Sequence, residues 1–404
     1  MKIKHKGEGI LEARAGILSF CRTAAVAFHL SAVVWVFSTG QLAADVSPLY
    51  DPDLERAGQL LLDMRLEEAE KLIGNSIERN AEKPAGYFFR SAALSWRIFL
   101  APERSDTKEL KKEFEKALST SRRFAEKAQS RSESRFEGTL YLGAVYGQEA
   151  LLALLDKKYL LMAPLARRAW NYLQEAVSLD PEYYDSYFGL GIYKYFTDVL
   201  PRMIKILALA YGFEGDREGG LTDLWLAVEK GLYSRDEAGI MLLNIYSITE
   251  TPDSSLGALA SELHRRYPDN PLIHWRYGDI LFRMKKYAEA GKIYQEVAER
   301  IEAGHPFYRN SMFSAYSIAY RLGACDRHLG KNREALERFK SILKAHDVTP
   351  EWVVPVSYLE CGSLYLAEGN TALAEKSLKA VLQYKDFSGS HSKAKALLEK
   401  LEHE

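Results

Sequence analysis

A glycine followed twelve residues later by an alanine, with a bulky residue four positions beyond, recurs three times in the last third of this 404-residue chain. The sets are Gly278, Ala290 and Tyr294; Gly323, Ala335 and Phe339; and Gly362, Ala374 and Leu378. Each set lies in about thirty residues that have helical periodicity on both sides of a tight turn. Small residues let helix backbones approach closely, and the bulky residue fills the gap between one hairpin and the next. The pattern therefore predicts a stack of helical hairpins.

Helical periodicity also runs through most of the preceding sequence, and no stretch shows the two-residue alternation typical of a sheet. The chain is therefore expected to be all-α. Helices are predicted over residues 54–64, 66–79, 87–100, 108–131, 235–249, 254–267 and 390–402. The predicted parts are N-terminal hairpins at 45–135, interrupted repeats at 136–230, an irregular hairpin at 231–270, three regular repeats at 271–386 and a capping helix at 387–404.

Two apolar insertions interrupt the repeats of residues 136–230. The first, residues 152–165, is rich in leucine, and the second covers residues 197–218. Within the second, residues 199–213 are apolar apart from two cations and the polar edges of the segment. This segment either packs against the rest of the protein or lies on a lipid surface. In the second case the predicted membrane contacts are Arg202, Ile204, Lys205 and Leu207.

Composition and charge exclude some classes of protein. Hydrophobic residues make up 47% of the chain and aromatic residues 12%, which is too much for a disordered protein. The 54 basic and 55 acidic residues almost cancel, giving a net charge of −1. A dedicated nucleic-acid-binding protein would carry a basic stripe, so we expect no nucleic-acid partner.

The first 44 residues differ from the rest of the chain. Basic residues predominate at the start, residues 24–37 are largely apolar, and small residues follow up to Ala44. This order is typical of a secretory signal peptide, and it predicts export to the periplasm or the envelope of a bacterium. The alternative is an uncleaved segment that anchors the protein to the inner membrane.

The repeats resemble the tetratricopeptide repeat, whose signature combines Trp-x2-Leu-Gly-x2-Tyr, Ala-x3-Phe-x2-Ala and a final proline. The matching residues are Tyr187, Leu190 and Gly191, and then Ala169, Leu173, Ala176 and Pro181. The resemblance implies a right-handed α-solenoid of about eight helical hairpins. It also implies that the first helix of each hairpin lines a concave groove holding an extended or helical peptide.

A narrower resemblance covers residues 184–230. The run contains Leu200-Pro201-Arg202, then Gly212-Phe213, and then Gly215-Asp216. It is similar to the insert of the tetratricopeptide repeat protein 39 family, which includes the fungal inclusion-body clearance proteins. Those proteins are intracellular, whereas this chain begins with an apparent export signal, so the resemblance supports architecture more than role.

Candidate partner-binding residues follow from the position of the glycines in each first helix. They are Phe188, Ile192, Tyr195, Trp275, Asp279, Phe282, Tyr320, Arg327 and His328. The lysine and asparagines that relatives use to bind chaperone tails are missing from such places. An aromatic, mildly basic groove suits an apolar or aromatic peptide segment instead. The alternative is that several of these rings belong to the core.

Aromatic residues are dense between residues 183 and 196. Repeat packing accounts for Tyr187 and Tyr193. Four others are then predicted to lie at the surface, where they would contact a peptide: Tyr184, Phe188, Tyr195 and Phe196.

Several kinds of chemical site are not expected. Cys325 and Cys361 are interpreted as small core residues, with a bridge between consecutive hairpins as the alternative. His264 and His274 lie ten residues apart, too far for sequence alone to pair them. The loop at residues 212–220 does not fit a calcium-loop pattern, although its Asp216 is expected to help start the next helix. We therefore expect no metal, no cofactor and no small-molecule substrate.

The sequence predicts a non-catalytic scaffold of the bacterial envelope that binds another protein on its concave face. The alternative is a peripheral membrane factor that acts through residues 199–213. A hydrolase would need an acid, a base and a nucleophile from separate hairpins, and none of the familiar catalytic motifs is present in the sequence.

Overall fold

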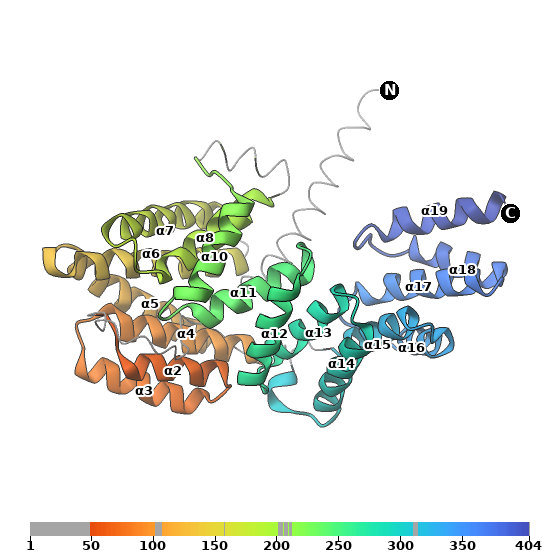
Figure 1. Ribbon diagram of the computed structural model, residues 1–404, viewed down its shortest axis with the longest axis horizontal. Coiled ribbons are helices and arrows are strands. Elements are labelled where there is room, and N and C mark those ends of the chain that lie inside the picture. Colours follow the sequence, from red (N-terminus) through yellow and green to blue (C-terminus); the bar gives the residue numbers. More distant parts are fainter. Residues whose placement is uncertain are drawn as a thin grey trace. The chain divides into compact units, whose positions relative to one another are not determined.

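The computed structural model describes residues 49–101, 107–156, 158–200, 205, 209, 212–309 and 314–403. Within these residues the regular structure consists of α-helices and two short 3-10 helices, with no strand (Figure 1). The predicted all-α class is confirmed. None of the helices found in these residues combines the length and the apolar character needed to cross a membrane. The predicted export segment lies outside the described residues.

The chain divides into two compact units, called unit 1 and unit 2 below. Of the described residues, those of 49–99, 107–250 and 265–267 form unit 1, and those of 100–101, 251–264 and 268–403 form unit 2. The predicted irregular hairpin is split by this division. Its first helix, α11 (Arg235–Ile248), packs on the preceding helix of unit 1, whereas most of its second, α12 (Ser254–Arg266), belongs to unit 2.

Besides α11, the helices of unit 1 are α2 (Pro52–Leu62), α3 (Leu66–Arg79), α4 (Pro84–Leu100), α5 (Lys108–Gln129), α6 (Arg135–Leu155), α7 (Tyr159–Leu179), α8 (Asp185–Asp198) and α10 (Arg217–Lys230) (Figure 1). Helix α2 packs on α3, and each described helix from α5 to α10 packs on the next one. The short helix η1 (Ser132–Ser134) precedes α6. Asp216 caps α10 as predicted, because its carboxylate accepts a hydrogen bond from the Gly219 N–H at 2.9 Å.

The first predicted insertion does not form a separate element. Residues 152–165 extend the end of α6 and the start of α7, so that each of these helices is 21 residues long. The two lengthened helices pack against one another. The leucine-rich residues predicted as an insertion therefore form extra turns at the end of α6 and the start of α7.

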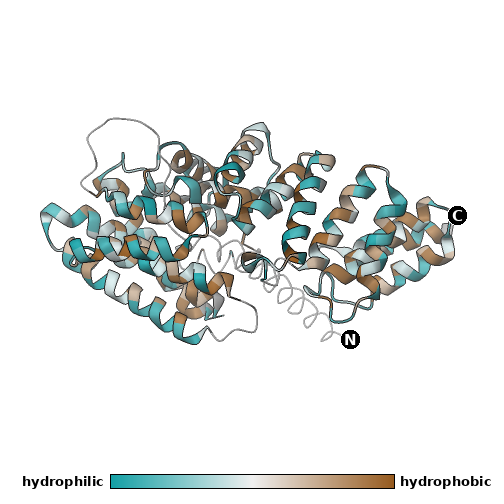
Figure 2. Ribbon diagram, turned by 90° about the horizontal axis from the view of Figure 1, so that it is seen from below, coloured by the Kyte–Doolittle hydropathy of each residue, from teal (hydrophilic) through white to brown (hydrophobic). Residues whose placement is uncertain are grey.

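Unit 2 contains α12 and the helices of the regular repeats (Figure 1). They are α13 (Pro271–Arg283), α14 (Tyr287–Glu302), η2 (Pro306–Tyr308), α15 (Ala315–His328), α16 (Asn332–Lys344), α17 (Val353–Ala367), α18 (Thr371–Val381) and α19 (Ser390–His403). Figure 2 shows apolar and polar stripes along these helices, as helices with one packed face require. Helix α19 packs on α17 and α18, as predicted for a cap.

The glycine pattern works within each hairpin as well as between hairpins. A Cβ atom on Gly323 would lie 2.8 Å from Cε1 of Phe339, so only glycine leaves room for that ring. Phe339 also belongs to a buried cluster with Cys361 and Leu364 of the next hairpin. The bulky residue therefore covers the glycine of its own hairpin and packs against the following one. The predicted contact between hairpins is correct, and the contact within the hairpin is an addition to it.

Candidate functional site

The structure separates the predicted groove residues into two groups. Five are half-buried or exposed, namely Ile192 on α8, Phe282 on α13, and Tyr320, Arg327 and His328 on α15. Four are buried, with exposed fractions of 2% for Phe188, 1% for Tyr195, 5% for Trp275 and 6% for Asp279. A partner could not reach these four without displacing the core. They are core residues, which was the alternative interpretation of the pattern.

Tyr195 is buried because it fastens α8 to the residues that follow α11. Its hydroxyl donates to the Glu250 carboxylate at 2.7 Å and lies 2.6 Å from the Thr249 hydroxyl. Arg217, at the start of α10, also donates to Glu250, with Nε at 2.7 Å from the carboxylate. The tyrosine thus has a structural role within unit 1.

The other rings of the aromatic segment divide in the same way. Tyr193 stacks between Trp170 and Phe213, with ring centroids 4.1 and 5.5 Å away, so its predicted packing role is correct. Tyr184 and Phe196 are half-buried. Only part of the predicted aromatic surface is therefore accessible.

A charged cluster lies beneath the first helices of the regular repeats in unit 2. The Asp279 carboxylate accepts hydrogen bonds from Trp275 Nε1 at 2.9 Å, Arg276 Nη1 at 3.0 Å, Tyr294 Oη at 2.7 Å and Arg321 Nε at 2.7 Å. Burial raises the pKa of Asp279, but the two guanidinium groups lower it more, so the net shift is downward. Asp279 therefore stays ionised and joins α13, α14 and α15.

Arg321 links this cluster to the aromatic rings of the next repeat. Its guanidinium lies 4.5 Å from the centroid of the Trp275 ring and 5.9 Å from that of Trp352. Trp352 in turn meets the Tyr320 ring edge to face at 5.5 Å. Cation–π contacts of this kind fix a guanidinium between rings, here between the buried Trp275 and the half-buried Trp352.

A second group of rings lies where α13 and α15 end. The His328 ring stacks on Tyr287 at 4.3 Å and meets the edge of Phe282 at 5.5 Å. The preceding residue, Arg327, pairs with Glu360 of α17. The first helices α13, α15 and α17 thus carry accessible rings and paired charges. We call the five residues Phe282, Tyr320, Arg327, His328 and Trp352 the ring face.

The ring face can hold a ligand. Its rings offer broad apolar contact at a small entropic cost. The carboxylates beside it, Asp279 and Glu360, are both paired with guanidinium groups. Paired carboxylates of this kind orient side chains and partners.

The membrane-contact prediction can be followed at only one of its residues. Arg202, Ile204 and Leu207 lie outside the described residues, whereas Lys205 is described. The Lys205 ammonium donates to the Asp198 carbonyl oxygen at 2.9 Å and pairs with the Asp198 carboxylate. Lys205 therefore closes the end of α8.

The cysteines of the described residues, Cys325 and Cys361, are free and buried. Burial raises the pKa of each thiol to about 12, so both are protonated at neutral pH. The interpretation as core residues is correct, and the alternative of a bridge between hairpins is not.

One arrangement in unit 2 was missed by the sequence reasoning. The rings of His264 on α12 and His274 on α13 stack with centroids 4.8 Å apart. The turn at residues 267–270 folds one helix back on the other, so ten residues of separation become ring contact. The sequence signal that could have found this pair is that each helix carries a histidine three or four residues from the turn.

Comparison with known proteins gives one family match. A tetratricopeptide-repeat family model matches residues 251–306, which hold α12, α13 and α14. No curated protein sequence matches the chain. The predicted tetratricopeptide repeat is confirmed for residues 251–306, whereas the narrower resemblance to the tetratricopeptide repeat protein 39 family stays a prediction.

Two solved structures show some similarity to the chain. The crystal structure of the APC/C hetero-tetramer Cut9-Hcn1 is 13% identical, with a TM-score of 0.41, over 89% of this chain and 65% of that one. The TPR domain of P58(IPK) is 13% identical, with a TM-score of 0.24, over 86% of this chain and 98% of that one. This chain thus spans slightly less than two thirds of the first of these proteins.

Proposed function

Because the chain is a tetratricopeptide-repeat protein, we propose that it is a non-catalytic scaffold of the bacterial cell envelope. It binds a segment of another protein along the first helices of its repeats. The observation that supports this proposal is the ring face. Accessible aromatic rings and a guanidinium group lie on consecutive first helices of unit 2, where they favour an extended segment with apolar or aromatic side chains.

Site-specific crosslinking in living cells tests the binding face. A photoreactive amino acid replaces Tyr320 or His328 in the ring face, and Glu337 or Ser341, both exposed on α16, in control variants. We expect the same discrete crosslinked protein from both ring-face positions and none from the α16 positions. Equal crosslinking from both helices, or none from the ring face, would contradict the proposal.

The envelope location is supported by the order of basic, apolar and small residues in residues 1–44. Cell fractionation followed by sequencing of the amino terminus tests it. We expect the protein in the periplasm or the membrane fraction, either shortened near residue 44 or retained at full length as an anchored form. A cytoplasmic protein with an intact amino terminus would contradict the location without affecting the binding face.

A second candidate function, attachment to a membrane surface, is favoured by exposed leucines on the two insertions. The exposed fractions are 93% for Leu160, 51% for Leu161 and 55% for Leu209. Large apolar side chains in such positions gain free energy when they enter a lipid headgroup region.

Liposome flotation separates the two functions. Replacing Leu160, Leu161 and Leu209 by serine should abolish flotation if the insertions bind lipid. The matched control replaces Leu329 and Leu373, which are 42% and 40% exposed in unit 2. If the wild type does not float, or if both sets of variants float equally well, the insertions have no membrane role.

A further inference from the structure

We propose that His264, His274 and Glu296 form a binding site for a first-row transition-metal dication, with Zn²⁺ as the expected ion. The sequence analysis expected no metal, so this inference departs from it. The three residues come from three successive helices, α12, α13 and α14. Their candidate ligand atoms all lie within 4.8 Å of one another.

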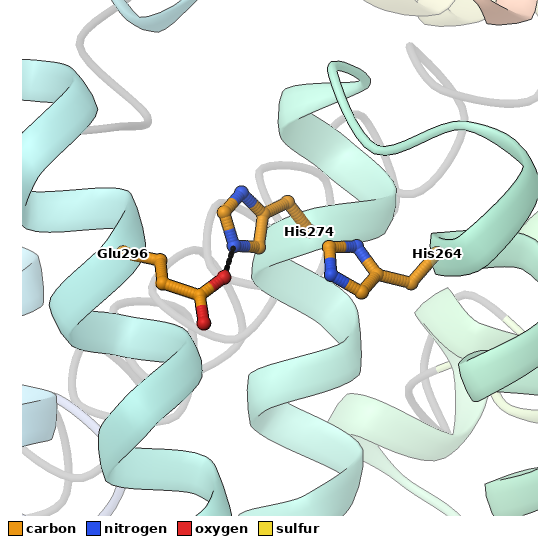
Figure 3. A group of neighbouring side chains, drawn as sticks. All are labelled: His264, His274 and Glu296. Carbon is orange, nitrogen blue, oxygen red and sulfur yellow. Dashed lines mark ion pairs between the residues drawn. The ribbon is translucent and has the colours of Figure 1, made fainter.

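The three side chains are neighbours. Figure 3 shows His274 between the other two, with the imidazole rings side by side and the Glu296 carboxylate turned toward the His274 ring. His274 Nε2 lies 3.4 Å from a carboxylate oxygen of Glu296. In a tetrahedral zinc site, bonds of about 2.0–2.1 Å place ligand atoms about 3.3 Å apart. The three candidate ligand atoms span up to 4.8 Å, so the His264 ring has to turn for all three to reach that spacing.

A buried ring nitrogen in this cluster makes no hydrogen bond. Among the described residues, His274 Nε2 has no hydrogen-bond partner, although the Glu296 carboxylate lies at an ion-pair distance, and the side chain of His274 is fully buried. A buried ring nitrogen without a partner is costly, and a native structure usually has a reason for keeping one. A metal ion would give such an imidazole nitrogen a partner.

Tyr308 supplies the second layer of the site. Its hydroxyl oxygen lies 2.8 Å from His274 Nδ1. When a metal occupies Nε2, the proton of the His274 ring is on Nδ1. The Nδ1–H then donates a hydrogen bond to the Tyr308 hydroxyl oxygen. Metal-binding histidines commonly have such a partner, which fixes the ring orientation. The nearby Arg300 is paired with Asp269, with 2.7 Å between Nη1 and Oδ1. Glu296 is the carboxylate of the cluster and provides its negative charge.

The ligand set selects the class of ion. Two imidazoles and one carboxylate favour zinc and its neighbours, whereas Ca²⁺ and Mg²⁺ prefer oxygen ligands. Because Glu296 is exposed, the site is open to solvent on one side, and water can fill the remaining coordination position. A bound ion would join α12, α13 and α14, the helices of the repeat that matches the tetratricopeptide family.

Zinc titration of the full chain tests the site. After removal of metals by a chelator, the wild type is titrated with Zn²⁺ in competition with a chromophoric chelator. We expect one tightly bound ion per chain. His264→Asn and Glu296→Gln change half-buried and exposed side chains, so the fold should survive, and both should lose stoichiometric binding. His346→Gln, which removes an exposed histidine outside the cluster, should bind like the wild type.

Thermal unfolding gives an independent measurement. Zn²⁺ should raise the Tm of the wild type and of His346→Gln but not that of Glu296→Gln, because an ion that binds only the folded state stabilises it. Tyr308→Phe should bind zinc about 10–100-fold more weakly, as expected for a positioning residue. A wild type that does not bind zinc, or an unchanged affinity in His264→Asn and Glu296→Gln, would overturn the proposal. An unchanged affinity in Tyr308→Phe would overturn the role of Tyr308.

Discussion

Unit 1 and unit 2 each bury an aspartate on the first helix of a hairpin, and they hold it in opposite ways. Asp185, at the start of α8, accepts hydrogen bonds from the backbone N–H groups of Leu232, Tyr233 and Ser234 at 3.2, 2.7 and 2.6 Å. It also accepts one from the Ser234 hydroxyl at 2.8 Å. Asp279 instead accepts only side-chain donors, two of which are guanidinium groups.

The two environments shift the carboxylate pKa values in opposite directions. Burial raises the pKa of Asp185, and its hydrogen bonds oppose this only in part. The pKa of Asp279 is lowered, because Arg321 and Arg276 outweigh the effect of burial. The surroundings of Asp185 therefore require an acceptor oxygen more than a negative charge. The surroundings of Asp279 require the negative charge.

The largest effect expected from this difference is that of Asp279→Ala. The change leaves two guanidinium groups in the core without their shared carboxylate, which should cost about 3–5 kcal/mol of unfolding free energy. Asp185→Asn keeps an acceptor oxygen in place and should cost about 1 kcal/mol. Urea denaturation measures both. Equal losses would mean that the two aspartates do not differ in the way described.

The two units also differ in what lies against their helix glycines. A Cβ atom on Gly220 of α10 would lie 2.6 Å from the Tyr195 backbone nitrogen and 2.8 Å from the Gly191 carbonyl oxygen. In unit 2, a Cβ atom on Gly362 would lie 2.7 Å from the Leu378 side chain. The first contact is between backbones, whereas the second involves a side chain that can adjust.

Gly220→Ala should therefore cost about 3 kcal/mol, because two helix backbones must separate. Gly362→Ala should cost about 1 kcal/mol, because Leu378 can move within its core cluster. Chemical denaturation gives both values under the same conditions. If Gly362→Ala proves the more damaging change, the distinction between backbone and side-chain contacts is wrong.

Much of the fold could be predicted because its signals are local. Periodicity over one helix located α3 at residues 66–79 as observed, and it placed the start of α5 and of α19 correctly. The matched glycines and bulky residues identified the contact between consecutive hairpins, as Phe339 with Cys361 and Leu364 shows. Each of these features depends on residues that are near one another in the sequence.

The candidate site could be predicted only in part, because its details depend on helix rotation and on distant contacts. One residue of error turns a side chain by about 100° around its helix, enough to move a ring from groove to core. Phe188 and Tyr195 are examples. The pairing of Asp185 with the turn at residues 232–234, and of His264 with His274, appears only when the chain folds back on itself.

The pH dependence of stability sharpens the comparison of the two aspartates. An unfolded aspartate has a pKa of about 3.9. The pKa of Asp279 is lower in the folded protein than in the unfolded chain. The ionised carboxylate therefore contributes fully to stability above about pH 4, and this contribution is lost as the pH falls through the pKa of the folded state. Because the pKa of Asp185 is higher when folded, its contribution is present in acid and is lost as the pH rises through the folded value.

Tm values between pH 2 and pH 8 for the wild type, Asp185→Asn and Asp279→Asn measure these slopes. The deficit of Asp279→Asn should shrink toward acid. The difference in Tm between Asp185→Asn and the wild type should shift in favour of the variant as the pH rises. Parallel profiles for the two variants would show that the aspartates titrate alike, contrary to their surroundings.

The smallest effects are expected where a glycine has room. Among the described residues, a Cβ atom on Gly147 of α6 would meet no heavy atom within 4 Å, and one on Gly291 of α14 would lie 3.8 Å from the Cys325 Cβ. Alanine favours a helix over glycine by about 0.5–1 kcal/mol, so Gly147→Ala and Gly291→Ala should each stabilise the protein by about that amount. Denaturation midpoints measure the gain, one variant in each unit. If either variant is destabilised, the loss in Gly220→Ala cannot be assigned to backbone contact, because glycine would then be needed even where space is open.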